Sequence, residues 1–99
     1  MQPSIELWQT EWCPSSRRVR QRLTELGLSF IAHQVPPDRD QRVELQAISA
    51  AGLIPVLRAD GAVVAGAEEI IAFLDARFEE PADAAGHRAK AERARAMAA

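Results

Sequence analysis

Residues 4–32, SIELWQTEWCPSSRRVRQRLTELGLSFIA, carry the pattern that decides the fold. Polar and apolar residues alternate over residues 4–8, which is typical of a half-buried β-strand. A helix is predicted to begin at Pro14, because proline suits a first helical turn, and to end at Gly27. Its apolar stripe consists of Val19, Leu23 and Leu26. Residues 28–32 are expected to form a second strand, so the three elements predict a β-α-β unit with parallel strands and a right-handed crossover.

The middle of the chain predicts a second helix and a hairpin. Asp38 is a candidate N-cap for a helix that continues toward Gly52 and carries the apolar residues Val43, Leu45, Ala47 and Ile48. Strands are expected over residues 55–58 and 62–65. They flank Asp60-Gly61, a dipeptide that favours a tight turn, so the two strands are predicted to be antiparallel.

A third helix is expected from about Ala67, with an apolar stripe at Ile70, Ile71, Leu74 and Phe78, and it is predicted to end at Pro81. The element order β-α-β-α-β-β-α predicts an α/β fold with a four-stranded mixed sheet flanked by helices. Residues 82–99 are rich in alanine and charged residues. They predict a C-terminal helix that packs loosely, because few apolar side chains are present to bury. Residues 1–81 are thus the expected domain and residues 82–99 its tail.

Composition excludes several classes of protein. A chain of 99 residues, 26% of them charged and with a net charge of −2, predicts one small soluble domain. Cys13 is the single cysteine and only two histidines are present, so neither a disulfide nor a metal site is expected. The N-terminus has no basic segment before a long apolar run, so we expect no membrane span and a cytoplasmic location. The slightly acidic balance argues against nucleic-acid binding.

Arginines crowd the polar face of the first predicted helix, at Arg17, Arg18, Arg20 and Arg22. They are open to three interpretations: a phosphate or nucleic-acid patch, a solvated helix face, or a docking surface for an acidic partner. Interspersed glutamates and the acidic balance favour the second and third interpretations over the first.

Cys13 lies at the junction of the first predicted strand and helix. Free backbone N–H groups and the helix dipole at such a junction favour an anion, and a thiolate is an anion. A lowered pKa makes a cysteine nucleophilic near neutral pH, and Arg17, one turn further on, is expected to add to this effect. The alternative is a buried cysteine that acts as a small apolar residue. Its position before an amphipathic helix favours the reactive thiol.

The motif Trp12-Cys13-Pro14-Ser15-Ser16 resembles the active site of glutaredoxins, with serine in place of the second cysteine. The chain is also similar to the N-terminal, glutathione-binding domain of cysteine-type glutathione transferases. This similarity rests on residues 13–30, 52–57 and 66–78, and the whole resemblance covers residues 4–80. It implies a thioredoxin-like fold, with Trp12, Pro14, Ser16 and Arg17 supporting Cys13.

The resemblance also implies a binding site for glutathione. The Ile54–Pro55 bond is expected to be cis, with the backbone of Ile54 pairing with the cysteinyl part of glutathione. Ala67 and Glu68 match the positions that receive the γ-glutamyl end, where helix N–H groups meet a carboxylate and a side-chain carboxylate meets an ammonium group. Thr10 departs from the family, because glutaredoxins commonly carry a lysine at this position; Arg17 and Arg42 are the candidate replacements.

A glutaredoxin with one cysteine implies a monothiol mechanism with glutathione as co-substrate, because no second thiol can resolve a mixed disulfide. Ser16 then donates a hydrogen bond to Cys13 or caps the helix. Expected partners are glutathione and glutathionylated proteins or small disulfides, and the chain is expected to be a monomer or weak dimer. Two alternatives stay open: an iron-sulfur cluster carrier in which two copies share a cluster with glutathione thiols, and a non-catalytic binding module derived from a transferase N-terminal domain.

Overall fold

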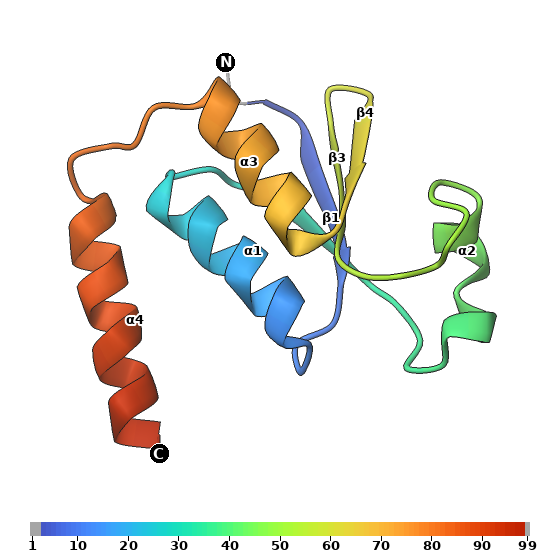
Figure 1. The fold of residues 1–99 in the computed structure, drawn as a ribbon, viewed down its shortest axis with the longest axis horizontal. Helices are drawn as coiled ribbons and strands as arrows, with labels where there is room; N and C mark the ends of the chain where they lie inside the picture. The colour runs from blue at the N-terminus through green and yellow to red at the C-terminus, as the bar shows by residue number, and fades with distance from the viewer. Residues whose placement is uncertain (1–2, 99) are drawn as a thin grey trace.

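The computed structural model describes residues 3–98. One mixed sheet has the strand order β2-β1-β3-β4 and consists of β1 (Ile5–Gln9), β2 (Ile31–Gln34), β3 (Val56–Ala59) and β4 (Ala62–Ala65). β1 and β2 are parallel, whereas β3 is antiparallel to both β1 and β4. The predicted β-α-β unit, the hairpin and the mixed four-stranded sheet are confirmed (Figure 1).

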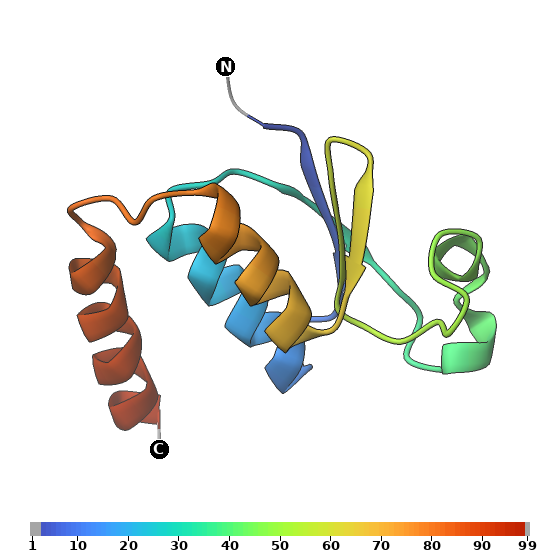
Figure 2. The same cartoon turned by 45° about the horizontal axis from the view of Figure 1, so that its top comes forward.

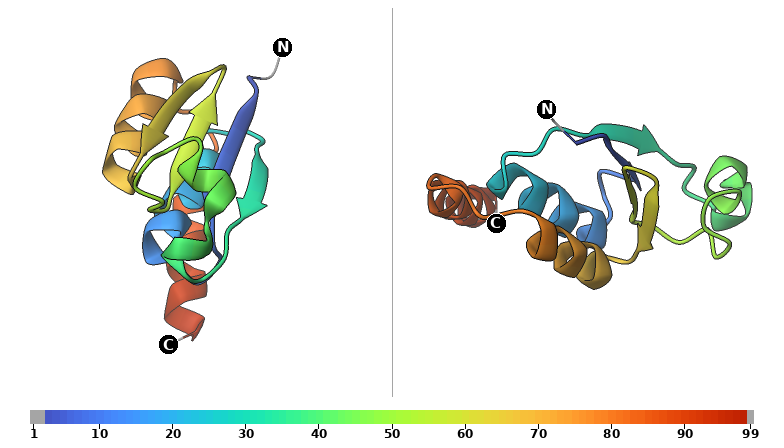
Figure 3. Two further views of the ribbon diagram at one scale, coloured as in Figure 1. Left: turned by 90° about the vertical axis from the view of Figure 1, so that its right-hand side faces the viewer. Right: turned by 90° about the horizontal axis from the view of Figure 1, so that it is seen from above.

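The helices cover the sheet unequally. Helices α1 (Pro14–Glu25) and α3 (Ala67–Arg77) lie side by side on one face, and α4 (Ala84–Ala98) packs against α1 further out (Figure 2). The view from above in Figure 3 places the short α2 (Val43–Gln46) on the other side of the sheet. No helix within residues 3–98 is long and apolar enough to cross a membrane.

The main core fills the space between the sheet and the pair α1 and α3. Leu7, Leu57, Leu23 and Leu74 are fully buried there, together with most of the predicted apolar stripes of both helices. Burying a leucine stabilises a fold by about 1.5–3 kcal/mol. A smaller cluster of Trp8, Leu45 and Val56 lies on the opposite face, under α2. Successive residues of β1 and β3 thus bury their side chains on both faces, which holds the sheet between its helices.

The second strand begins at Ile31 and not at Leu28, so the predicted range of residues 28–32 was wrong at both ends. Gly27 has a φ of 68°, a left-handed conformation that turns the chain at the end of α1. Leu28 and Phe30 then pack against the main core without pairing in the sheet. Their apolar character reflected burial, and pairing with β1 starts only when Ile31 comes opposite Glu6.

The expected second helix is broken in two, which corrects the prediction of one helix from Asp38 to Gly52. A 3-10 helix (Arg39–Gln41) and the one-turn α2 are separated by Arg42, whose φ of −85° and ψ of 58° are not helical. Arg42 is only 7% exposed. Its guanidinium group donates hydrogen bonds to the carbonyl oxygens of Pro36 at 2.8 Å, Gly52 at 3.0 Å and Pro37 at 3.1 Å. Arg42 therefore holds this segment in its irregular shape.

His33 of β2 contacts Glu6 and Trp8 of the neighbouring strand β1. Its Nε2 atom lies 3.0 Å from the carboxylate of Glu6, and its ring stacks on Trp8 with the ring centroids 4.6 Å apart. The guanidinium group of Arg58 lies over the same indole ring. Within residues 3–98 no three His, Cys, Asp or Glu side chains gather as a metal ion would require.

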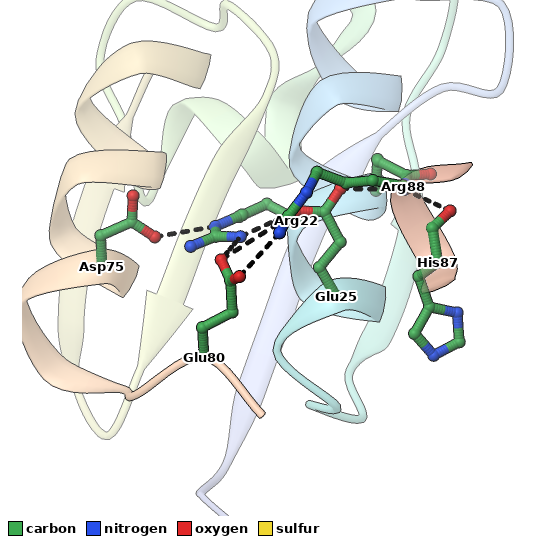
Figure 4. A network of polar contacts seen from close by, with 7 residues as sticks. Arg22, Glu25, Asp75, Glu80, His87 and Arg88 are labelled. Carbon is green, nitrogen blue, oxygen red and sulfur yellow. Dashed lines mark hydrogen bonds and ion pairs between the residues drawn. The ribbon is translucent and has the colours of Figure 1, made fainter. Parts of the chain in front are cut away.

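A network of ion pairs fastens α4 to the domain (Figure 4). Arg22 of α1 donates to Asp75 at 2.8 Å, to Glu80 at 2.9 Å and to Glu25 at 2.8 Å. Arg88 of α4 donates to Glu80 at 2.7 Å and to Glu25 at 3.2 Å. The interpretation of Arg22 as part of a solvated face was therefore wrong, because acidic residues from three separate segments surround its guanidinium group.

Glu80 makes the docking of α4 dependent on pH. Hydrogen bonds from Arg88 and Arg22 lower the pKa of Glu80 to about 2 from the ordinary 4.5. A carboxylate with a lowered folded-state pKa stabilises the fold above its unfolded pKa, and this contribution is lost as the pH falls toward the folded pKa. Between pH 4.5 and pH 2, we expect α4 to lose protection in amide hydrogen exchange before the main core does.

The variant Glu80→Gln tests this assignment. It should lose protection in α4 already at neutral pH and show a weaker acid dependence of unfolding by urea. Glu79→Gln is the matched control, because Glu79 is exposed and forms no ion pair within residues 3–98. Equal acid dependence in the two variants would contradict a role for Glu80.

Candidate functional site

The register of the sheet gathers the predicted site segments at one end of the molecule. Trp8 pairs with Val56, and Val56 pairs with Ala65, so the three residues form a row across β1, β3 and β4. Beyond Trp8 the chain continues from β1 to Cys13. Pro55 directly precedes Val56 of β3, and Ala67 follows Ala65 at the end of β4. Figure 1 shows the first turns of α1 and α3 at this same end of the sheet. A hydrogen bond of 2.9 Å from the Gly66 amide to the Pro55 carbonyl joins two of the segments.

Cys13 is the N-cap of α1. Its backbone is extended, with φ −77° and ψ 119°, and its sulfur accepts a hydrogen bond of 3.4 Å from the Ser16 amide. Pro14 occupies the first helical position, where its missing N–H group costs no hydrogen bond. The thiol is partly exposed and is the only cysteine of the chain. The sulfur thus has the position that an oxygen atom has in an ordinary helix cap.

The pKa of the Cys13 thiol lies below its ordinary value. Partial burial is the largest single influence and acts to raise the pKa, since it disfavours the charged thiolate. Hydrogen bonding by Ser16, the backbone amide of Ser15 and the positive charge of Arg20 together outweigh burial. A larger fraction of thiolate at neutral pH makes Cys13 a better nucleophile than a free cysteine.

Arg20 was not predicted as a site residue, yet its positive charge acts on the thiol, and the expected contribution of Arg17 stays a prediction. The Arg20 guanidinium group bonds to the Gln9 side chain, to the carbonyl oxygens of Thr10 at 3.2 Å and Glu11 at 3.4 Å, and to the Glu11 carboxylate at 3.4 Å. It therefore braces the β1–α1 loop and brings a positive charge toward the sulfur. The signal in the sequence was its spacing: Arg20 is seven residues after Cys13, which is about two helical turns on the same face.

Two residues close to Cys13 in the chain carry buried hydroxyl groups. Thr10 and Ser16 are 4% and 0% exposed, and neither hydroxyl oxygen has a hydrogen-bond partner of ordinary geometry within residues 3–98. Ser16 nevertheless lies close enough to the sulfur to stabilise its ionised form. Thr10 presents its backbone carbonyl to the Cys13 amide at 3.4 Å. Trp12, in contrast, is 65% exposed beside the cysteine.

The segment around Pro55 and the start of α3, where the resemblance implies glutathione binding, lie at the same end of the sheet as Cys13. The Ile54–Pro55 bond is cis, as the resemblance predicted. Gly66, with φ 92°, precedes α3, and no side chain caps the first turn of this helix. Ala67 is buried and Glu68 is exposed at that turn. Arg42 is directed to backbone carbonyl groups, which leaves it unsuited to replace the missing lysine.

Fold and site together define a thioredoxin-like domain with a thiol at the start of its first helix. Comparison with known protein families shows to which family of thioredoxin-like domains the chain belongs. Residues 7–82 match the family Glutathione S-transferase, N-terminal domain. The match covers more than half of the chain, and the protein belongs to this family.

Individual relatives show the same two resemblances. An uncharacterized glutaredoxin-like 8.6 kDa protein in the rubredoxin operon of Clostridium pasteurianum is 26% identical over 62 residues, which are 63% of this chain and 83% of that protein. The solved structure of a glutathione S-transferase domain-containing protein from Marinobacter aquaeolei is 27% identical, with a TM-score of 0.66 over 77% of this chain. A glutathione transferase homolog from Drosophila mojavensis, solved with bound glutathione, is 20% identical, with a TM-score of 0.71 over 77% of this chain. The matches span 40% and 36% of those two solved chains.

The role of Ser16 is testable through the pKa of Cys13. Ser16→Ala removes a buried hydroxyl that stabilises the thiolate, so the pKa of Cys13 should rise and its alkylation by iodoacetamide at neutral pH should slow. The measurement is the alkylation rate as a function of pH. Ser15→Ala is the matched control, because Ser15 acts through its backbone amide, which alanine retains. If the pH midpoint of alkylation is unchanged in Ser16→Ala, the Ser16 hydroxyl does not stabilise the thiolate.

Proposed function

We propose that this protein is a glutathione-dependent thiol–disulfide oxidoreductase that works by a monothiol mechanism through Cys13. The observation that carries the proposal is the Cys13 sulfur at the cap of α1, partly exposed and with a lowered pKa. The family match and the glutaredoxin-like relative support a role that involves glutathione. The proposal assigns the activity to the cytoplasm, because a reducing glutathione pool is needed to complete the cycle.

The first step consumes a glutathionylated substrate, R–S–SG. The Cys13 thiolate attacks the sulfur of the glutathionyl group, a Cys13–SG bond forms, and the old disulfide bond breaks. The leaving thiolate R–S⁻ takes the electron pair of that bond and then a proton from water. Hydrogen bonds from the Ser16 and Ser15 amides favour the ionised form of the attacking sulfur before the step.

The second step uses free glutathione as the reductant. Its thiolate attacks the glutathionyl sulfur held on Cys13, oxidised glutathione leaves, and the Cys13 thiolate is restored. The net reaction converts R–S–SG and one glutathione into R–SH and oxidised glutathione. The chain offers no second cysteine to compete in this step, and the corresponding position holds the buried Ser16.

Three backbone and side-chain features are proposed to hold glutathione. The backbone of Ile54, before the cis proline, is expected to pair with the cysteinyl part. The uncapped amides at Ala67 and Glu68 suit the γ-glutamyl carboxylate, and the Glu68 carboxylate suits its ammonium group. Thr10 supplies no positive charge where glutaredoxins carry lysine, so binding is expected to be weaker than in those proteins.

The central test is mass spectrometry of the protein after treatment with oxidised glutathione. The wild-type protein should gain one glutathionyl group, and added reduced glutathione should remove it. Cys13→Ser should gain none and lose all turnover with a glutathionylated peptide, because it has no other thiol. Residual turnover in Cys13→Ser would contradict the mechanism.

The glutathione site is tested by Glu68→Gln. Loss of a charge-assisted contact with the ammonium group should raise the dissociation constant of reduced glutathione about tenfold, or roughly 1.4 kcal/mol. Glu69→Gln, in the same exposed first turn of α3, serves as the control and should bind nearly as the wild type does. Isothermal titration of Cys13→Ser carrying each change separates binding from chemistry. Equal weakening in both variants would point to a general charge effect and against a specific role for Glu68.

The second candidate function is a binding module without catalysis, which the transferase family match favours. It would bind glutathione through the same segments while Cys13 stayed unreactive. An ordinary thiol pKa with no glutathionyl adduct would support it over the oxidoreductase. The iron-sulfur carrier makes a different prediction, because a purified carrier would be brown and absorb visible light.

A further inference from the structure

A groove of about 480 Å³ lies between α1, α3 and α4, beside the candidate site. Helix α4 turns back beside α1, and the two helices diverge toward the start of α1 (Figure 2). The groove accordingly joins Pro14, Arg17 and Arg18 of α1 to Ile71 of α3 and Arg95 of α4. A volume of this size falls within the range of small-ligand sites, about 300–1,000 Å³.

Positive charge is concentrated in this groove. Arg22 and Glu25 also line it, but both belong to the ion-pair network that fastens α4. In contrast, Arg17, Arg18 and Arg95 form no ion pair within residues 3–98. Three guanidinium groups that share one groove repel one another, in a chain whose net charge is −2. A bound anion would relieve this repulsion.

The side chains that line the groove determine which kind of anion fits it. The planar guanidinium group donates paired N–H bonds that match a carboxylate or a phosphate group. Ile71 adds an apolar wall at the α3 side of the groove. Such a lining suits a small organic molecule that carries two or more negative charges.

The groove lies close to the start of α1, where the proposed reaction takes place. Pro14 lines the groove and directly follows Cys13 in the chain, so a ligand held there lies next to the first turn of the helix that the thiol caps. We propose that this groove binds the carboxylate or phosphate groups of the leaving thiol R–SH, so that the protein prefers anionic glutathione mixed disulfides. The inference rests on the proposed function, because it names the substrate class of the same site.

The kinetic test compares two mixed disulfides of glutathione, one with the neutral thiol 2-mercaptoethanol and one with the dicarboxylic thiol mercaptosuccinate. For each protein variant, kcat/KM for the anionic disulfide is divided by that for the neutral one, which cancels effects common to both substrates. Arg18→Gln and Arg95→Gln should each lower this ratio about tenfold. Arg93→Gln removes the same charge from an exposed position of α4 outside the groove and should leave the ratio unchanged. Equal ratios in all four proteins would overturn the proposal.

A binding experiment tests the groove as an anion site without the redox reaction. Citrate is titrated into Cys13→Ser and into the same protein with Arg18→Gln and Arg95→Gln added, with amide chemical shifts as the readout. Citrate should shift amides of α1 and α4 in the first protein, and the affinity should fall at least tenfold in the second. Equal affinity in both proteins would overturn the groove as an anion site.

The two tests separate failure of the groove from failure of the proposed function. Turnover of both disulfides with unchanged ratios and equal citrate affinities rejects the groove and leaves the oxidoreductase standing. No turnover of either disulfide rejects the oxidoreductase and, with it, the role of the groove in substrate choice. In that case, citrate binding that depends on Arg18 and Arg95 would show an anion site in a protein with another function.

Discussion

The pairing of Trp8, Val56 and Ala65 across three strands is the constraint on which the rest of the structure depends. It places the ends of β1, β3 and β4 in one row, from which the chain reaches the thiol, the cis proline and the start of α3. Neighbouring residues of β3 bury their side chains on opposite faces, with Val56 under α2 and Leu57 under α1 and α3. A slip of one residue would exchange these faces, so the two apolar clusters enforce the register that assembles the site.

Arginine residues divide into two groups by the partners they find. Arg20, Arg22 and Arg42 are directed inward, where they brace the β1–α1 loop, fasten α4 and hold the irregular segment before β3. Each of them uses several of its donors at once, which a lysine could not do with its compact ammonium group. Arg17, Arg18 and Arg95 instead face the groove without carboxylate partners among the described residues. The first group stabilises the fold, and the second leaves positive charge available in the groove.

The thiol site combines opposing influences. Partial burial disfavours the thiolate, whereas the amides at the start of α1 and the charge of Arg20 favour it. Because the sulfur itself caps the helix, ionisation and helix initiation depend on the same hydrogen bonds. The start of α3 is different, since no side chain caps it and its amides are free for a ligand. One helix start is thus capped by a thiol, and the other has no side-chain cap.

Several features could be predicted from the sequence because they depend on residues that are close together in the chain. The alternation before Trp8, the Asp60-Gly61 turn and the apolar stripes of α1 and α3 predicted the elements and their order. Cys13-Pro14 predicted a thiol at a helix start. Predictions were less accurate where a distant contact prevails, as at Leu28 and Phe30, which are apolar yet stay outside the sheet.

Only the tertiary structure decided how the charged side chains are used. The sequence shows a run of arginines, but Arg22 pairs with Asp75 and Glu80 far along the chain, whereas Arg20 binds carbonyl oxygens of the β1–α1 loop. Spacing alone could not separate Arg20 from Arg17. The broken second helix has the same cause, since Arg42 binds the carbonyl of Gly52 instead of continuing a helix. Local sequence determines which elements form, because backbone preferences act over a few residues. Packing of distant segments decides what each charge faces, and therefore which residues surround the thiol.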